Sequence, residues 1–467
     1  MKYLLICLYI VTVNLLFTQM TMGEIDSLII ENRTTPITIE LIDINGLPVM
    51  GRDIEILQLS HTFDFGCVTG NLLELDPEIK EMYEETFLKY FNSTVDEVSM
   101  KWLQVEANQD DLDFNKSDYI YNWSMENNLK FRGHTLFWSK EDQVPGWARE
   151  LTDDELLAEM KEHISDMLQR YPDINEWDLN NEMLPLLDGY NYFRDRFGGD
   201  GIIDSMLTWS RQINPNARYY LNEFGVFNGY MQNFYVDMIH DFLDQGISFD
   251  GIGIQGHIQT EIDSPPALPT GNGEIIFSAT HLWTILEGMA QFNLPIKITE
   301  FGFNAPDETT HALWLTNFMK VMYAHPMVEG VIRWGFWEGA TYENEMTIFD
   351  INFNPKPSAL AYYNLVYEEW WTNDTMQTDL FGKIEIELHH GNHSFRILDT
   401  DGSHFGEISV LIEPNEMNNS NFQLLFDVCG GGGVEDNCGI CDNDTTNDDE
   451  TCTGCMDKNY EEYDEDA

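Results

Sequence analysis

The chain has 467 residues, of which 43% are hydrophobic, so it can form one large domain with a sizeable core and smaller appendages. It carries 24 Lys and Arg against 81 Asp and Glu, which gives a formal net charge of -57. A charge this negative repels phosphate backbones and anionic lipids, so we expect neither nucleic acid nor a membrane surface as a partner.

The first 23 residues have the pattern of a secretory signal peptide. Lys2 is followed by a mostly apolar run from Tyr3 to Phe17, and then by Met22-Gly23. The apolar run is too short for a helix that spans a membrane. We therefore expect residues 1–23 to be a cleaved signal peptide and the mature protein to be secreted and extracellular.

Residues 24–62 are predicted to be an N-terminal β segment. Apolar and polar residues alternate from Thr35 to Leu59 around an Asn45-Gly46 turn. This alternation is typical of a hairpin packed on the following domain, or of a short β-module.

Residues 63–373 alternate eight times between strand-like and helix-like segments. In one predicted helix, Asp153–Arg170, the apolar residues fall on one face. Eight βα repeats in a segment of this size predict an α/β fold, a (β/α)8 TIM barrel. An open doubly wound sheet is the alternative, but no Gly-rich phosphate loop follows the first strand. The predicted strands are Asp64–Asn71, Glu97–Trp102, Lys130–Trp138, Asn175–Glu182, Arg218–Phe224, Asp250–Ile258, Pro295–Phe301 and Glu329–Trp337.

Two further parts follow the predicted barrel. Residues 374–428 are predicted to form a small β module, with strands at Lys383–Leu388, Ser394–Leu398 and Ile408–Ile412. Residues 429–467 are an acidic tail with five cysteines, which in a secreted protein favours disulfides over zinc. Asp and Asn at alternate positions in 436–444 suit Ca²⁺ in this tail, and an acidic disulfide-linked linker is an equal alternative.

Polar residues stand where the predicted barrel strands end, and in a barrel these ends face the active-site mouth. Glu182 and Glu300 end the fourth and seventh strands, across the mouth from each other. Glycoside hydrolysis needs one carboxylic acid to protonate the leaving oxygen and one carboxylate to attack the sugar or activate water. The alternative is that these carboxylates form salt bridges, but 24 cations for 81 acids leave few partners.

Five segments in the same order resemble glycoside hydrolase family 10 from about Phe63 to Thr372. They read RGHTLFW at Arg132–Trp138, WDLNNE at Trp177–Glu182, QGH at Gln255–His257, ITE at Ile298–Glu300 and WGFWEG at Trp334–Gly339. The resemblance implies an endo-1,4-β-xylanase that acts on xylan or a related β-1,4-linked polysaccharide with retention, needs no cofactor for catalysis and has no metal in the barrel.

The resemblance also implies the roles of individual residues. Glu182 is similar to the acid/base of the family and Glu300 to its nucleophile. Because an acid and a nucleophile need different ionisation states, we expect Glu182 to be held protonated while Glu300 stays ionised. The residues that resemble the substrate-binding lining are Glu97, Lys101, His134, Trp138, Asn181, Gln255, His257, Trp334 and Tyr342. We expect the protein to act as a monomer.

The chain departs from the commonest family pattern at four positions: Val98 and Phe224 replace an Asn and a Tyr, Ser139 replaces a His, and Gly302 replaces an Asp. These changes bear on subsite affinity and pH optimum, while both Glu182 and Glu300 are present. Two alternatives remain within the same fold: a catalytically weak or inactive carbohydrate-binding barrel, and a β-1,4-glucanase.

Overall fold

The computed structural model describes residues 19–70, 72–184, 189–258, 272–340, 346–398, 404–414, 420–426, 434–435 and 441–442. The chain divides into two compact units. One, called here the barrel unit, contains residues up to Arg33 and Phe63–Glu369. The other, called here the sandwich unit, contains Thr34–Thr62 and the chain from Trp370 onward.

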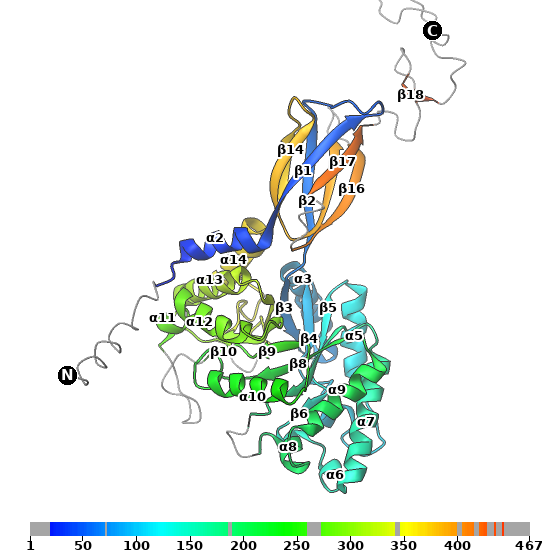
Figure 1. The fold of residues 1–467 in the computed structure, drawn as a ribbon, viewed down its shortest axis with the longest axis vertical. Helices are drawn as coiled ribbons and strands as arrows, with labels where there is room; N and C mark the ends of the chain where they lie inside the picture. The colour runs from blue at the N-terminus through cyan, green and yellow to red at the C-terminus, as the bar shows by residue number, and fades with distance from the viewer. Residues whose placement is uncertain are drawn as a thin grey trace, which may run out of the picture. The chain divides into compact units, whose positions relative to one another are not determined.

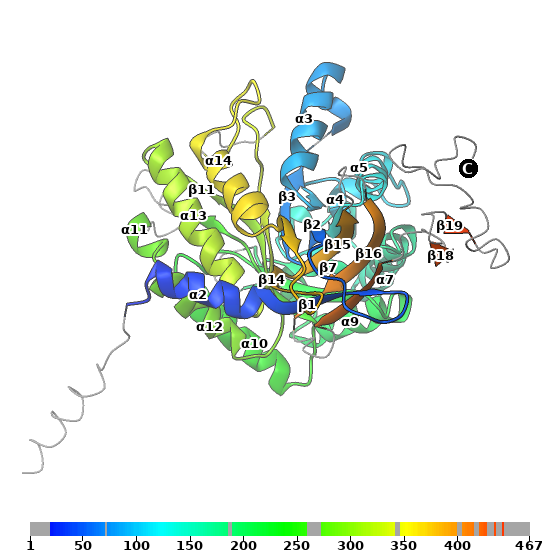
Figure 2. The same ribbon diagram turned by 90° about the horizontal axis from the view of Figure 1, so that it is seen from above.

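Eight parallel strands close into a ring in the barrel unit (Figures 1 and 2). Each strand pairs with the next along the chain, and β12 (Val328–Arg333) pairs with β3 (Asp64–Thr69) to close the ring. This confirms the predicted (β/α)8 barrel. The barrel strands are β3 (Asp64–Thr69), β4 (Ser93–Asp96), β5 (Lys130–Gly133), β7 (Glu176–Asn181), β8 (Arg218–Glu223), β9 (Gly251–Ile254), β11 (Ile296–Phe303) and β12 (Val328–Arg333). Two short strands, β6 (Phe137–Trp138) and β10 (His257–Ile258), extend the pairing.

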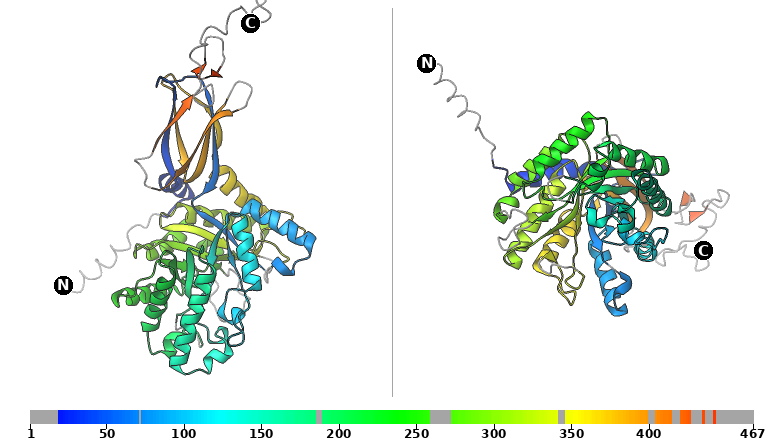
Figure 3. Two further views of the ribbon diagram at one scale, coloured as in Figure 1. Left: turned by 90° about the vertical axis from the view of Figure 1, so that its right-hand side faces the viewer. Right: turned by 90° about the horizontal axis from the view of Figure 1, so that it is seen from below.

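Helices surround this ring, as the view from below in Figure 3 shows. Helix α7 (Asp153–Arg170) starts and ends where the sequence predicts, and Thr152 and Glu155 form a capping box at its start. The longer helices are α3 (Pro77–Tyr90), α5 (Asn115–Glu126), α7 (Asp153–Arg170), α9 (Gly201–Ile213), α10 (Gln232–Asp244), α12 (Ala279–Ala290), α13 (Glu308–Ala324) and α14 (Pro357–Asn364). The shorter ones are η1 (Leu72–Glu74), α4 (Trp102–Val105), η2 (Glu141–Gln143), α6 (Gly146–Arg149), α8 (Tyr192–Arg196), α11 (Gly273–Ile276) and η4 (Leu365–Glu369).

The second barrel strand was predicted at the wrong place. It is β4, at Ser93–Asp96, whereas the predicted segment from Glu97 to Trp102 is a turn that leads into α4. The side chain of Asp96 accepts hydrogen bonds from the backbone N–H groups of Val98 and Ser99, which turns the chain away from the sheet. The strand itself is short, and its β-branched residues Thr94 and Val95 fit a buried strand.

The start of the predicted N-terminal β segment is a helix. Helix α2 (Met22–Arg33) belongs to the barrel unit and contacts α13. The buried guanidinium of Arg33 donates hydrogen bonds to the backbone carbonyls of Tyr323, His325 and Val328. These carbonyls lie at and after the end of α13, where a helix leaves acceptors without intrahelical partners. Residues 1–18 of the predicted signal peptide lie outside the described residues.

Two sheets with a common core form the sandwich unit. One has the order β14-β1-β17 and the other β13-β2-β15-β16. Isoleucines of β1 and β2 pack in this core with Phe395 and Leu424. The strands are β1 (Thr34–Asp43), β2 (Asp53–His61), β13 (Asn373–Gln377), β14 (Lys383–His389), β15 (Gly391–Leu398), β16 (His404–Ile412) and β17 (Asn421–Phe426). The short strands β18 (Val434–Glu435) and β19 (Cys441–Asp442) pair with each other.

The two N-terminal strands do not form a hairpin, which was one of the two arrangements predicted for this segment. β1 pairs with β14 and β17, while β2 pairs with β13 and β15 in the other sheet. The N-terminal segment and the C-terminal β module therefore make one unit, although they were predicted as separate parts. Both strands bury mostly alternate residues, and strands from the far end of the chain complete the core that these residues face.

Among the helices that the structure describes, none has the length and apolar character needed to cross a membrane.

Candidate active site

The two predicted catalytic carboxylates lie at the carboxyl ends of their strands. Glu300 is in β11, and Glu182 directly follows β7. The backbone of Glu182 has a φ of 54°, a conformation that few residues other than glycine adopt. Its N–H donates to the carbonyl of Asn222 in β8, which fixes this conformation against the neighbouring strand.

Glu182 is held by two donors. Trp138 Nε1 donates to its Oε2 at 2.8 Å, and Gln255 Nε2 donates to its Oε1 at 2.9 Å. Burial raises the pKa of Glu182 above its usual range, and the negative charge of Glu300 acts in the same direction, against the two hydrogen bonds. A raised pKa favours the protonated form that a general acid needs.

Glu300 is buried and also accepts two hydrogen bonds. Asn222 Nδ2 donates to Oε1 at 2.8 Å, and His257 Nε2 lies 3.0 Å from Oε2. Burial acts to raise the pKa of Glu300, but the hydrogen bond with His257 and the charge of His134 outweigh it, so the pKa lies below its usual range. Glu300 is therefore suited to remain ionised.

Asn181 and Gln255 connect the two carboxylates. Asn181 Oδ1 accepts from Asn222 Nδ2 at 2.9 Å and from Gln255 Nε2 at 3.2 Å. Since Asn222 also reaches Glu300 and Gln255 also reaches Glu182, a continuous set of hydrogen bonds joins the two carboxylates. Asn222, which ends β8, was not among the predicted site residues, and its position at a strand end is the sequence signal that could have identified it.

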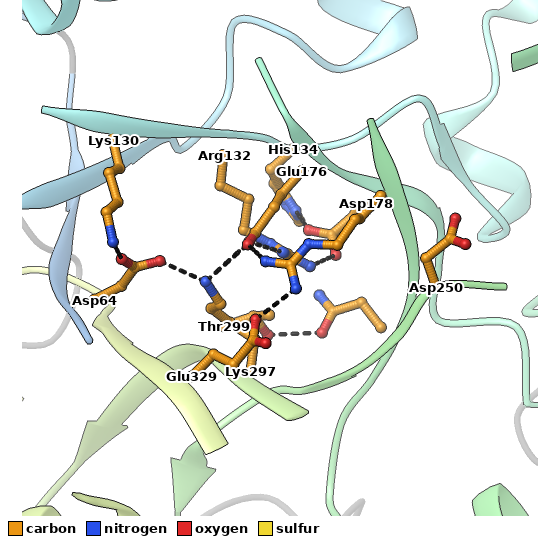
Figure 4. Close-up of polar contacts among 12 residues, drawn as sticks. Asp64, Lys130, Arg132, His134, Glu176, Asp178, Asp250, Lys297, Thr299 and Glu329 are labelled. Carbon is orange, nitrogen blue, oxygen red and sulfur yellow. Dashed lines mark hydrogen bonds and ion pairs between the residues drawn. The ribbon is translucent and has the colours of Figure 1, made fainter. Parts of the chain in front are cut away.

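His134 is oriented by an aspartate that was not among the predicted site residues. Its Nδ1 lies 2.9 Å from Asp178 Oδ2, and Arg132 Nη2 donates to Asp178 Oδ1 at 2.6 Å (Figure 4). All three side chains are buried. Burial opposes the charge of Asp178, but Arg132 and His134 outweigh it and lower its pKa. The imidazole of His134 thus has one nitrogen fixed by a carboxylate.

Of the remaining predicted binding residues, those that the structure describes lie on the same side of the barrel: Glu97, Lys101, Trp138 and Trp334. Lys101 Nζ lies 4.6 Å from the ring centre of Trp138, and the Trp334 ring meets His134 and His257 edge-on, at 5.5 and 5.9 Å between ring centres. Burial lowers the pKa of the Lys101 ammonium and raises that of the Glu97 carboxyl. Tyr342 lies outside the described residues.

Two aromatic residues near the site, Tyr190 and Phe224, were not among the predicted site residues. The rings of Tyr190 and Phe224 lie 5.8 Å apart, and Lys140 Nζ is 5.8 Å from the ring centre of Tyr190. Burial raises the pKa of the Tyr190 hydroxyl to about 12, and the charge of Glu182 adds to this effect. Tyr190 lies in a loop after β7, where no periodic pattern distinguishes a site residue from a surface aromatic.

Two of the departures from the family pattern have clear structural consequences. Gly302 stands opposite His257 in the β10–β11 register, and the buried Nδ1 of His257 has no hydrogen-bond partner among the described residues. Ser139 is buried and donates to Asn180 Oδ1 at 2.8 Å. One imidazole nitrogen of His257 is therefore without a hydrogen bond among the described residues, whereas Ser139 is bonded to a residue of β7.

Glu223 is a third acidic residue at the carboxyl ends of the barrel strands. It is fully buried at the end of β8, and its Oε1 accepts from the backbone N–H of Met183 at 2.6 Å. Burial raises its pKa well above the usual range, and the charge of Glu182 contributes. Glu223 thus supports the backbone that follows Glu182.

No group of three or more His, Cys, Asp or Glu residues suited to a metal ion occurs in the described part of the chain. The predicted Ca²⁺ ligands lie in the tail, where only residues 434–435 and 441–442 are described, so calcium there stays a prediction.

Comparison with known proteins gives a consistent result. The chain matches glycosyl hydrolase family 10 over residues 58–367. It is 27% identical over 373 residues to the anti-sigma-I factor RsgI6 of Acetivibrio thermocellus, a match that covers 79% of this chain and 45% of that protein. It is 30% identical over 291 residues to endo-1,4-beta-xylanase 3 of Arabidopsis thaliana, covering 61% of this chain and 35% of that enzyme. The chain spans less than half the length of these curated relatives.

The fold is also similar to solved structures. Xylanase 10B from Thermotoga petrophila RKU-1, solved in complex with xylobiose, matches with a TM-score of 0.56 and 25% identity, over 66% of this chain and 95% of that enzyme. Native xylanase 10B from Thermotoga maritima matches with a TM-score of 0.56 and 24% identity, over 66% of this chain and 96% of that one, which supports the fold.

Proposed function

The chain belongs to glycosyl hydrolase family 10, and from this premise we propose that it is a secreted endo-1,4-β-xylanase that cleaves internal bonds of xylan with retention. The observation that supports the proposal best is the pair Glu182 and Glu300. The pKa of Glu182 is raised and that of Glu300 is lowered, so one carboxyl group can hold a proton while the other is ionised.

In the first step, Glu300 acts as the nucleophile and Glu182 as the general acid. An oxygen of Glu300 attacks the anomeric carbon as the bond from that carbon to the glycosidic oxygen breaks, and Glu182 gives its proton to the leaving oxygen. The products are a covalent glycosyl-enzyme and a shortened xylan chain with a free hydroxyl. For direct attack, the two carboxyl groups must lie about 5–5.5 Å apart in the substrate complex.

The second step reverses the roles. Glu182, now ionised, takes a proton from a water molecule, whose oxygen attacks the anomeric carbon as the bond to Glu300 breaks. Glu300 has no negative charge while it is glycosylated, which removes one of the effects that raise the pKa of Glu182. Two displacements restore the original anomeric configuration.

The surrounding residues suggest how a sugar would be held. His134 and Lys101 offer donors near Glu300, and Trp334 presents an aromatic ring beside both histidines. The names of several relatives and of similar solved structures, which are xylanases, support xylan over other β-1,4-linked polysaccharides. We propose that the protein acts outside the cell and as a monomer, with residues 1–23 removed.

Product analysis tests this proposal against its rivals. Purified protein is incubated with xylan, cellulose and mixed-linkage glucan, and early products are followed by NMR of the anomeric protons. We expect β-configured xylo-oligosaccharides from xylan. A β-1,4-glucanase would instead release reducing ends from the glucans, and an inactive carbohydrate-binding barrel would release none from any of the three. An α-configured first product would falsify the double displacement.

A further inference from the structure

Arg333, the last residue of β12, is a buried cation with no carboxylate partner in the part of the chain that the structure describes. Its side chain is 1% exposed, and Nη2 donates to the backbone carbonyl of Met346 at 2.7 Å. The guanidinium carbon lies 5.5 Å from the ring centre of Phe301. Nε and Nη1 are buried and have no hydrogen-bond partner among the described residues. Because arginine stays protonated in proteins, Arg333 holds a positive charge inside the barrel wall with donors unused.

Two other buried arginines have the partners that Arg333 lacks. Arg132 pairs with Glu176 at 3.0 Å and with Asp178 at 2.6 Å. Arg33 donates to three backbone carbonyls at the end of α13. A buried charge without such compensation is costly in the low-dielectric interior of a protein. An anion bound beside Arg333 removes that cost.

Helix α14 supplies two hydroxyl groups near this cation. Ser358 and Tyr362 stand one turn apart, so their side chains are on the same face of the helix. Both residues are buried, and neither Ser358 Oγ nor Tyr362 Oη has a hydrogen-bond partner among the described residues. Burial raises the pKa of Tyr362 well above its usual range, and the positive charge of Arg333 acts against it, so the hydroxyl and the guanidinium are near each other. Two neutral donors thus accompany the charged one.

Helix α13, which lies beside α14 (Figures 1 and 2), adds an imidazole. His311 is buried, and its Nε2 has no hydrogen-bond partner in the described ranges. Burial lowers the pKa of His311 to about 3, and the charges of Arg333 and Lys356 act in the same direction, so the ring is neutral at pH 7. Glu308 and Glu338 pair with Lys356 at 3.6 and 2.9 Å. The unsatisfied groups gathered around the guanidinium can therefore all donate, and none is a carboxylate.

We propose that a monovalent inorganic anion, chloride, binds between β12, α13 and α14 and accepts hydrogen bonds from Arg333, Tyr362 and Ser358. One negative charge balances one guanidinium, whereas a sulfate or phosphate dianion leaves an excess charge in the barrel wall. Because Trp334 directly follows Arg333, the anion also fixes the strand end that carries an aromatic residue of the candidate active site. The inference does not depend on which polysaccharide the protein cleaves.

Thermal unfolding of the full chain in two sodium salts tests the inference. The melting temperature is measured in chloride and in gluconate at the same ionic strength, because a chain with a net charge of -57 responds to ionic strength alone. We expect chloride to raise the melting temperature of the wild type by roughly 2–5 °C in a saturable manner. Arg333→Met should abolish this gain and keep nearly the wild-type melting temperature in gluconate, because it removes an unpaired buried charge. Crystals soaked in sodium bromide should show an anomalous scattering peak between Arg333 and α14.

A second variant keeps the test decisive if Arg333→Met does not fold. Tyr362→Phe removes one neutral donor, so the chloride concentration that gives half of the thermal shift should rise several-fold. Tyr220→Phe is the matched control, since Tyr220 Oη is also buried without a hydrogen-bond partner among the described residues. It lies over Arg132, whose charge is already paired, so this change should leave the chloride dependence as it is in the wild type.

Three results overturn the inference. The first is a chloride effect of equal size in the wild type and in Arg333→Met, which means a general salt effect. The second is a fall in the melting temperature of Arg333→Met that is the same in both salts, with no chloride effect in the wild type, which means that Arg333 acts only through its hydrogen bond to Met346. The third is a wild type insensitive to chloride whose melting temperature falls in Glu343→Gln or Glu345→Gln, which assigns the counterion to the chain itself.

Discussion

Buried carboxylates at the two ends of the barrel have different kinds of partner. At the amino ends of the strands, Lys297 Nζ lies 2.5 Å from Asp64 and 2.9 Å from Glu176 (Figure 4). Arg218 binds Glu176 and Glu329 at the same end. At the carboxyl ends, neither Glu182 nor Glu300 pairs with a Lys or Arg among the described residues. Their polar partners are amide, indole and imidazole groups.

The pKa values of Glu176, Glu182 and Glu97 follow this division, whereas that of Glu300 is lowered by the neighbouring histidines. Burial acts to raise the pKa of Glu176, but Lys297, Arg132 and Arg218 outweigh it and lower the value. At the mouth, burial raises the pKa of Glu182 and Glu97 because fewer cations oppose it. With 24 Lys and Arg for 81 acids, the location of the cations decides which buried carboxylates are structural and which are chemically available.

Replacing Glu300 by Gln should have the largest effect on turnover. The amide keeps the size of the side chain but cannot form the glycosyl-enzyme, so kcat on xylan should fall about 10⁴-fold or more. The melting temperature should fall only slightly, because the amide keeps the size of the side chain and loses only the interactions with His257 and His134 that lower the pKa of Glu300. Steady-state kinetics and thermal unfolding are measured together, with the exposed Glu126→Gln on α5 as control. Substantial residual turnover would contradict the role of Glu300.

Replacing Lys297 by Met should lower the stability of the protein and largely preserve its turnover, the opposite of what is expected for Glu300→Gln. Asp64 and Glu176 would lose their shared cation inside the barrel, which should lower the free energy of unfolding by roughly 3–5 kcal/mol. Turnover per folded molecule should remain within a few-fold of wild type, although Lys297 and Glu300 are in the same strand. Urea unfolding at neutral pH measures the first quantity, with the exposed Lys161→Met on α7 as control. An equal loss of free energy of unfolding in Lys297→Met and Lys161→Met would contradict the structural role of the cations at the amino ends of the strands.

The pH dependence of this stability difference has a definite sign. Lys297 lowers the folded-state pKa of both Asp64 and Glu176, in each case against burial. Their contribution to stability is therefore complete above the ordinary carboxyl pKa of about 4 and is lost as the pH falls below it. The difference between wild type and Lys297→Met should shrink from pH 7 to pH 3 in urea titrations. A difference that grows over this range would contradict the assignment.

The sequence predicts the barrel and its two carboxylates because both depend on local patterns. The hydrophobic pattern of each repeat indicates its strand and its helix, and a polar residue marks the end of a strand, as Glu182 and Glu300 do. The pairing of β1 and β2 could not be predicted, since their partners β14 and β15 lie more than 300 residues away. The supporting roles of Asp178 and Asn222 also depend on which neighbouring strand each side chain faces, and alternation within one strand does not show this.

The smallest predicted effect concerns the upper limit of the pH range for activity. Burial and the charge of Glu300 raise the pKa of Glu182, whereas the hydrogen bond from Trp138 Nε1 at 2.8 Å lowers it. Replacing Trp138 by Phe keeps an aromatic ring but removes this donor, so the pKa of Glu182 should rise further. The alkaline limb of kcat/KM should then move up by less than about one pH unit, because Glu182 stays protonated to higher pH.

The acid limb of the same profile should not move, because it reports the ionisation of Glu300, which accepts its hydrogen bonds from Asn222 and His257 instead. Trp147→Phe is the matched control: its Nε1 donates to the backbone carbonyl of Glu106 at 3.0 Å, so the same change there should move neither limb. An alkaline limb that moves down in Trp138→Phe would mean that the indole N–H supports the protonated form of Glu182. A shift of the acid limb alone would mean that Trp138 acts on the nucleophile, and the separate tuning of the two carboxylates would then be wrong.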